Sequence, residues 1–413
     1  MVIREYSKVE LVFSSSESEA VKIALVNLRR DLIRTLDCSV TAGGIIRILV
    51  GTVGNLPELD EKADISKLRA EDGTYRKEAF LIQEKDGELL IVGTDRRGTI
   101  YGIYDFCEWL GVSPWYFFAD VPVRRRSEAV IENGYCKVDY PSVEYRGIFI
   151  NDEEELEHWV WCYMGETTIG VKTYEKIFEL LLRLKLNYIW PAMHVNSFNL
   201  KQENGALANR MGIVVGTSHC DMLMRSNNRE WKPWLAKKGY TDVKYDFSIP
   251  GRNREILKEY WRESVEQNRD FEVSYTVGMR GIHDSGFETK SLEGLTGEKL
   301  LKAKIELLES VMAAQQEILS ETLDTEPMKT FVPYKEVLEL YDNGLKVPED
   351  LTLIWTNDNY GYVRRYPGEK EKARKNGNGI YYHNSYWAPP GASYLFICSI
   401  PMSHTRKIGR ASC

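Results

Sequence analysis

Residues 145–155 read YRGIFINDEEE, and this stretch constrains the fold more than any other. Ile148, Phe149 and Ile150 form a short apolar run, which is typical of a strand covered on both faces. The run ends abruptly in an amide and four acids. A strand that delivers carboxylates at its carboxyl end is how a (β/α)8 barrel begins an active site. The same acids equally suit the first turn of a helix, where Asp and Glu are favoured.

From this stretch onward, short apolar runs alternate with stretches of helical periodicity, as in a parallel sheet with crossover helices. The runs predict strands at 145–150, 187–190, 213–216, 271–277, 329–332, 351–355 and 379–382. Helices are predicted at 173–185, 203–211, 253–269, 299–321 and 335–343. The only later apolar run is 394–400, so a clean eighth strand is not predicted. The pattern therefore favours a (β/α)8-type barrel that is incomplete at its C-terminal end.

Residues 1–140 lack this rhythm and predict a separate, small α+β domain. Strands are predicted at 9–13 and 47–51, with a hairpin at 79–83 and 89–93 around Asp86 and Gly87. Helices are predicted at 17–36 and 97–110, and residues 115–118 (WYFF) predict an aromatic strand. Pro141 disfavours helix in the residue before it, so we place the boundary there and expect domains at 1–140 and 141–413.

Polar side chains follow each predicted barrel strand. In chain order they are Asn151 and Asp152; His194 and Asn196; His219 and Asp221; Arg280, His283 and Asp284; Tyr334, Lys335 and Glu336; Asn357, Asp358, Asn359 and Tyr360; His383, Asn384 and Tyr386. One face of a barrel collects all of these positions, which predicts an active site there. Plainer explanations stay open: Arg280 with Asp284 suits a simple ion pair, and Glu336 suits a helix N-terminus.

Composition and absent motifs narrow the function. The 413 residues carry a net charge of −7, which argues against nucleic acid as a partner. Seven Cys without a CxxC pair, and no HxH, HExxH, GxGxxG, phosphate-loop or GxSxG motif, predict neither metal nor cofactor. Several carboxylates with amide, His and Tyr neighbours remain, and this set suits glycoside hydrolysis by paired acids.

No targeting signal is predicted from the sequence. The N-terminus MVIREYSKVELVF has no apolar segment followed by a cleavage site, so we expect no signal peptide and a cytoplasmic location. No apolar run approaches the roughly 18 residues that a membrane span requires, and no membrane partner is expected.

Six stretches resemble the family-115 glycoside hydrolases, the xylan α-1,2-glucuronidases. They are YRGIFINDEE, VGTSHCDML, YTVGMRGIHD, VPYKEVLELYDNG, LTLIWTNDNYGYVRR and GNGIYYHNSYWAPPGASY, and they span residues 145–394 in the family's order. Residues 93–118 also resemble the small domain that precedes the barrel in α-glucuronidases and β-hexosaminidases. The resemblance implies removal of (4-O-methyl-)glucuronic acid from α-1,2-substituted xylan by an inverting mechanism with paired carboxylates.

The resemblance also implies roles for particular residues. Its catalytic candidates are Glu336, Asp284 and Asp152, and which of them is acid and which is base stays open. Its substrate-binding candidates are Asn151, His219, Arg280, Asn359 and Tyr386. Arg280 is expected to hold the uronate carboxylate, because a guanidinium fork matches that group bidentately. Glucuronoxylan or its oligosaccharides are the expected partners, and homo-oligomer formation is left open.

The resemblance fades after residue 403, where HTRKIGRASC is unlike the family. It therefore implies a barrel without its last strand, and we expect weak activity and self-association through unpaired strand edges. Two alternatives remain at this point. One is a non-catalytic carbohydrate-binding remnant of such an enzyme, and the other is a different α-glucuronidase- or hexosaminidase-type glycosidase.

Overall fold

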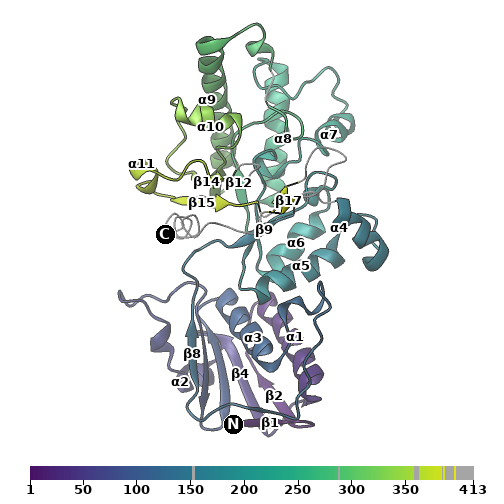
Figure 1. Cartoon of the computed structure of the whole chain (residues 1–413), viewed down its shortest axis with the longest axis vertical. Coiled ribbons are helices and arrows are strands. Elements are labelled where there is room, and N and C mark those ends of the chain that lie inside the picture. Colours follow the sequence, from purple (N-terminus) through teal and green to yellow (C-terminus); the bar gives the residue numbers. More distant parts are fainter. Residues whose placement is uncertain (151–153, 287–288, 358–361, 384, 387–394, 397–413) are drawn as a thin grey trace. The chain divides into compact units, whose positions relative to one another are not determined.

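The computed structural model describes residues 1–150, 154–286, 289–357, 362–383, 385–386 and 395–396 (Figure 1). The chain forms two compact units. The first comprises Met1–Gly147, Lys172–Tyr188 and Leu207–Ile213, and the second comprises Ile148–Val171, Ile189–Ala206 and Val214–Cys413. Both units combine sheets with helices, which confirms the predicted α/β class. The boundary expected at residue 140 stays a prediction.

The first unit is built on a mixed sheet with the strand order β3-β2-β4-β6-β5-β8. The strands are β2 (Lys8–Val12), β3 (Ser39–Val40), β4 (Ile46–Thr52), β5 (Phe80–Lys85), β6 (Glu88–Gly93) and β8 (Cys136–Asp139). Strand β2 pairs in parallel with both β3 and β4, and β4 pairs in parallel with β6. Strand β5 pairs antiparallel with β6 on one side and with β8 on the other. A separate ribbon pairs β1 (Val2–Arg4) with β7 (Glu128–Val130).

Local sequence explains these elements. Helix α1 (Glu19–Leu36) begins where the Ser18 hydroxyl accepts the Val21 N–H, and α3 (Arg96–Leu110) begins at the Asp95 carboxylate. The hairpin between β5 and β6 turns through Asp86 and Gly87, whose φ angles of 53° and 81° suit a tight two-residue turn. The structure confirms the two predicted helices, α1 and α3. It also confirms the predicted strands β2 and β4 and the hairpin of β5 and β6.

The aromatic strand predicted at 115–118 is wrong. Residues Pro114–Tyr116 form a 3-10 helix instead. Ser113 accepts the Trp115 N–H and Pro114 occupies the first helical position, and both features favour a helical start over a strand.

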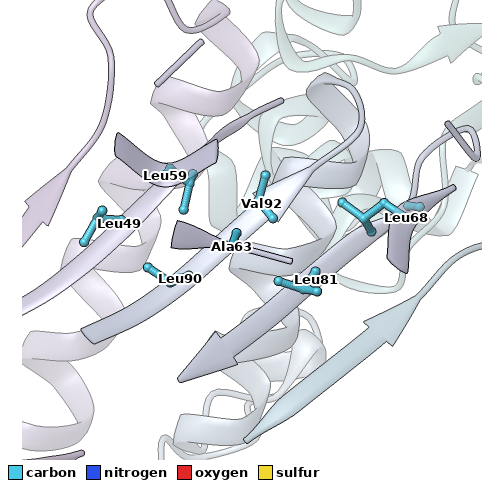
Figure 2. Close-up of a cluster of buried hydrophobic side chains, with 8 residues drawn as sticks. Leu49, Leu59, Ala63, Leu68, Leu81, Leu90 and Val92 are labelled. Carbon is cyan, nitrogen blue, oxygen red and sulfur yellow. The ribbon is translucent and has the colours of Figure 1, made fainter. Parts of the chain in front are cut away.

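One layer of the first unit's core lies between its sheet and the short helices α2 (Pro57–Lys62) and Ile65–Leu68 (Figure 2). The cluster consists of buried aliphatic side chains, namely Leu49, Leu59, Ala63, Leu68, Ala79, Leu81, Leu90 and Val92. On α3, Gly102 permits close approach to the sheet, since a Cβ there would lie 2.9 Å from the Ile91 side chain.

The strands predicted from residue 145 onward form in sequence order, and they lie in the second unit except for Gly147 and Tyr188, which belong to the first. They are β9 (Gly147–Phe149), β10 (Tyr188–Trp190), β11 (Val214–Val215), β12 (Ser274–Thr276), β13 (Met328–Phe331), β14 (Thr352–Thr356) and β15 (Asn378–Tyr381). Strands β9 to β11 form one sheet and β12 to β15 another, and a parallel bridge between Val215 and Val273 joins the two. Strands β12 to β15 pair in parallel throughout. Each strand predicted from residue 145 to 382 is therefore confirmed.

Helices lie between these strands along the chain (Figure 1). They are α4 (Glu154–Trp159), α5 (Val171–Arg183), α6 (Gln202–Met211), α7 (Trp231–Lys238), α8 (Arg252–Asn268), α9 (Gly297–Thr322), α10 (Glu336–Asp342) and α11 (Glu369–Lys372). None in the described part of the chain is long and apolar enough to cross a membrane. The apolar run at 394–400 lies outside the described residues except for β17 (Leu395–Phe396), which pairs with β16 (Ser385–Tyr386).

Strand β9 is not covered on both faces as predicted, because Ile148 is 41% exposed. Among the described strands β9 pairs only with β10, so it forms the edge of its sheet. Its Phe149 ring nevertheless packs 5.5 Å from both the Trp190 ring of β10 and the Tyr381 ring of β15. The first and last of these parallel strands therefore contribute to one aromatic cluster.

In the first unit, α5 is held against α1 by buried charges. Arg183 pairs with Asp31 at 2.6 Å and with Glu179 at 2.9 Å, and Arg30 pairs with Glu179 at 2.7 Å. Burial alone would raise the pKa of Glu179, but Arg183 and Arg30 outweigh it and lower the pKa to about 2. Glu179 is thus a stabilising anion at neutral pH.

Glu179→Gln should destabilise the protein by about 3 kcal/mol at pH 7, because a fall in pKa from 4.5 to about 2 corresponds to that energy. The lowered pKa stabilises the fold above pH 4.5, and this contribution disappears as the pH falls toward 2. Urea unfolding at pH 7 and at about pH 2.5 measures the difference, with the exposed Glu108→Gln as control. An equal loss at both pH values would contradict this account.

Candidate active site

The segments that follow β11, β12 and β13 bring four of the predicted site residues together. His219 follows β11, Arg280 and Asp284 follow β12, and Glu336 is the first residue of α10 after β13. Their side chains make direct contacts with one another. The carboxyl ends of parallel strands therefore form a compact polar site, as this kind of sheet allows.

Asp284 lies at the centre of these contacts. One carboxylate oxygen is 2.8 Å from Nε2 of His219, and the other contacts Nζ of Lys335. Nε of Arg280 lies 3.4 Å from the first oxygen. Burial would raise the pKa of Asp284, but His219, Lys335 and Arg280 hold it well below its usual range. Asp284 is therefore a fixed anion and a poor proton carrier at neutral pH.

Arg280 joins the two carboxylates of the site. Its side chain is 2% exposed, and its Nη2 atom lies 3.2 Å from Oε1 of Glu336. The same Nη2 donates to the backbone carbonyl of Asp284 at 3.0 Å. The guanidinium thus forms an ion pair with each of the two acids.

Among the described residues, four buried polar atoms in this cluster lack a hydrogen-bond partner. They are Nδ1 of His219, Nε and Nη1 of Arg280, and Oε1 of Glu336. The ion pairs of Arg280 bring opposite charges close without the alignment that a hydrogen bond requires. Buried polar groups are nearly always paired in native proteins, so such a concentration marks a place where water or a ligand completes the bonding. A cavity of about 10 Å³ lined by His219, Arg280 and Gly278 among others has room for one such water.

His219 is uncharged in this arrangement. Burial lowers its pKa, and the positive charges of Arg280 and Lys335 act in the same direction against the effect of Asp284. The neutral ring donates its Nε2–H to Asp284, which leaves Nδ1 as an acceptor. Its ring centroid lies 4.7 Å from that of Tyr334, so the imidazole is fixed in orientation.

Lys335 has the most exposed charge of the cluster, with 41% of its side chain accessible. Its backbone adopts φ 52° and ψ −127°, a conformation that is strained for any residue with a Cβ. The ammonium contacts Asp284 and lies 5.4 Å from the centre of the Tyr334 ring. Strain of this kind persists at functional sites where it places a side chain.

Two buried amides position the loops of the site. Gln315 on α9 accepts the Gly278 N–H at 2.8 Å and donates to the Gly278 carbonyl at 2.9 Å. Asn227 donates to the carbonyls of Cys220 and Gly281, both at 3.0 Å. The loops that carry His219 and Arg280 are therefore fixed by side chains that the sequence analysis did not select, since neither amide follows a strand.

Asn357 and His383 extend the polar surface after β14 and β15. Both the backbone N–H and Nδ1 of His383 lie 2.8 Å from Oδ1 of Asn357. Burial lowers the pKa of His383 to about 3, so the ring is neutral. Both residues were among the polar side chains that follow predicted strands, and that position is the signal that could have selected them as site residues.

A histidine pair lies beside this cluster in sequence and in space. The rings of His194 and His283 are 4.0 Å apart, and Glu154 lies 3.8 Å from His194. His283 directly precedes Asp284 and has a φ of 61°. The pair therefore directly adjoins Asp284 along the chain.

Other predicted site residues are not placed. Asn151, Asp152 and Asn359 lie outside the described residues. Tyr386 is in β16, and the structure describes its backbone but not its side chain. Among the residues that the structure describes, no group of His, Cys, Asp and Glu is arranged to hold a metal ion.

Glycoside hydrolases use paired carboxylates, and here two carboxylates at the carboxyl ends of parallel strands are bridged by a guanidinium. Glycosyl hydrolase family 115 matches residues 138–411, and the chain belongs to this family. The resemblance found in the sequence is thereby confirmed.

A solved structure of the family supports this assignment. It is BtGH115A, described as a 4-O-methyl-α-glucuronidase with specificity for decorated arabinogalactans. It is 35% identical with a TM-score of 0.86, and the match covers 100% of this chain and 53% of BtGH115A. The chain thus spans about half the length of that relative.

Weaker matches include a family-138 enzyme that targets pectin rhamnogalacturonan II and a β-N-acetylhexosaminidase from Bacteroides fragilis. Each is 14% identical with a TM-score of 0.48. The match to the family-138 enzyme covers 84% of this chain and 48% of that enzyme. The match to the hexosaminidase covers 86% of this chain and 67% of that enzyme. Curated proteins include no significant match.

The strained backbone at Lys335 leads to a stability prediction. Lys335→Gly should be more stable than Lys335→Ala by roughly 1 kcal/mol, because glycine adopts positive φ without the Cβ clash. Both variants lose the same charge, so their difference isolates the backbone. Thermal unfolding of the two variants measures it, and an alanine variant at least as stable as the glycine variant would refute the strain.

Proposed function

We propose that this chain carries the site of an inverting α-glucuronidase that removes (4-O-methyl-)glucuronic acid from α-1,2-substituted xylan. The observation that supports it most is the Arg280 guanidinium between Asp284 and Glu336. Within the described part of the chain, polar atoms of Arg280, Glu336 and His219 have no hydrogen-bond partner. The ring hydroxyls of a sugar offer the donors and acceptors that such a cluster lacks. Family membership supports the same reaction class.

The parallel strands support a barrel of the (β/α)8 type. Seven strands are adjacent in sequence order across the described residues, and rings from β9 and β15 share a cluster. We infer that the sheet curves back on itself, so that the loops after each strand surround one site.

The carboxylates are not equivalent in this proposal. Asp284 is ionised and held by His219, Lys335 and Arg280, so it cannot supply a proton at neutral pH. Glu336 contacts Arg280 and is 26% exposed, so substrate can reach it. We assign proton transfer to Glu336, with Asp152 as the candidate for the second carboxylate. In an inverting enzyme the two would lie roughly 6.5–9.5 Å apart, leaving room for water.

Recognition of the uronate is assigned to Lys335 in place of Arg280. Arg280 is buried and pairs with both Asp284 and Glu336, so we assign it the orientation of the acids. The exposed ammonium of Lys335 has an outer side that can meet a carboxylate. The strained backbone of Lys335 places its ammonium at the site. The ammonium is a compact charge, and this suffices for one ionic contact with the uronate carboxylate.

Arabinogalactan is a second candidate for the polysaccharide backbone that bears the uronate, because BtGH115A is described as specific for decorated arabinogalactans. Release of uronic acid from glucuronoxylan and from glucuronate-bearing arabinogalactan, assayed side by side, separates these substrates. Binding of either one without any release of uronic acid would instead support a non-catalytic carbohydrate-binding protein.

Glu336→Gln should lower the rate of uronic acid release by roughly 10²-fold or more, the usual effect of losing a positioned acid or base. Glu339→Gln is the matched control, since Glu339 lies in the same first turn of α10 and is exposed. Initial rates on a reduced glucuronoxylo-oligosaccharide measure both. A near-normal rate for the Glu336→Gln variant would remove this carboxylate from the mechanism.

A further inference from the structure

The first unit contains a cavity of about 270 Å³ that shares no residue with the candidate active site. Its floor is apolar and buried, formed by Ile82 of β5, Leu89 of β6 and Phe106 of α3. Trp109 of α3 and Val130 of β7 form the mouth and are 37% and 53% exposed. The cavity is thus a pocket that opens to solvent.

Aromatic rings form one wall of this pocket. Phe106 and Trp109 stack with their centroids 5.6 Å apart and their planes inclined by 16°. The guanidinium of Arg126 lies 5.6 Å from the Trp109 ring. The Trp109 ring is therefore fixed by its neighbours, and a fixed aromatic surface binds with little loss of conformational entropy.

Polar groups complete the pocket. Asp105 is nearly buried, and both of its oxygens accept from Lys137, at 2.8 and 2.7 Å, while Lys185 donates to one of them at 2.8 Å. Glu132 and Tyr135 add a carboxylate and a phenol at the rim. The pocket therefore offers several oxygen acceptors beside apolar surface.

The rim is held in place before any ligand binds. Oε2 of Glu84 accepts the Gly134 N–H at 2.8 Å, and the Glu84 N–H donates to the Tyr135 carbonyl at 2.8 Å. The amino group of Met1 donates to the Ile131 carbonyl at 2.9 Å. The turn that carries Glu132 and Tyr135 is thus anchored at both ends.

We propose that this pocket binds one neutral pyranose unit of a polysaccharide main chain, a second carbohydrate site in addition to the catalytic one. The inference rests on the proposed function, which makes a polysaccharide the substrate. A pyranose has an apolar C–H face for the aromatic wall and hydroxyls for the carboxylates and the phenol. The volume suits a single small ring and is below the usual range for larger ligands. Lys137 and Lys185 already donate to Asp105, and Glu132 adds a carboxylate at the rim, so the pocket favours a neutral ring over a uronate.

The test is titration calorimetry of the full chain with xylotetraose and with galactotetraose, neither of which carries a uronate. Trp109→Ala removes the aromatic wall, and Val130→Trp fills the mouth from an exposed position without altering the floor. Either change should weaken binding by about tenfold or more. Trp115→Ala, which alters an exposed Trp outside the pocket, should leave binding unchanged.

Each outcome decides the inference. Absence of binding by the wild type, or binding that persists in both Trp109→Ala and Val130→Trp, would overturn it. Tighter binding of free glucuronate than of xylose, sensitive to Val130→Trp, would overturn the neutral class of ligand. Failure of the proposed function has a separate signature, because uronic acid release would be absent while pocket-dependent binding of the neutral probes continued.

Discussion

The buried guanidinium of Arg280 is the group on which the rest of the site depends. The Arg280 side chain is 2% exposed, and a charge buried to this extent is stable only when it is paired. Arg280 forms ion pairs with Asp284 and with Glu336. In pairing with both, it fixes the separation and orientation of two acids that follow different strands. Its own position follows from Gln315, which clamps the backbone at Gly278.

The remaining charges of the site follow from this pairing. Asp284 carries the contacts with His219 and Lys335, which keep it ionised and keep the imidazole oriented. Lys335 is then the cation with access to solvent, on a strained backbone. In our proposal the buried cation orients the acids and the exposed cation meets the substrate. The incomplete hydrogen bonding of the cluster is what a bound sugar would complete.

Much of the fold follows from periodicity alone. The apolar patterning at 145–150 and 329–332, for example, predicts strands, and the structure has strands β9 and β13 there. Periodicity also placed His219, Arg280, Asp284 and Glu336 after strands, and the structure brings them together. It failed at residues 115–118, where a proline and a serine cap outweighed aromatic strand propensity.

Other features could not be read from the sequence, because they depend on tertiary contacts. Among the described strands β9 pairs only with β10 and its Ile148 is exposed, which spacing along the chain does not reveal. The contrast between a buried Arg280 and an exposed Lys335 depends on packing, and Asn227 and Gln315 act from positions that follow no strand. The acids around Arg183 likewise come from helices far apart in the sequence.

The most direct test of this account is a crystal structure of the Glu336→Gln protein with a bound glucuronoxylo-oligosaccharide. We expect the uronate carboxylate within hydrogen-bond distance of Lys335 Nζ, and the glycosidic oxygen beside the substituted side chain, with Arg280 still between Asp284 and that side chain. A uronate carboxylate bound by Arg280 after displacement of Asp284, or a sugar bound away from this cluster, would contradict the account.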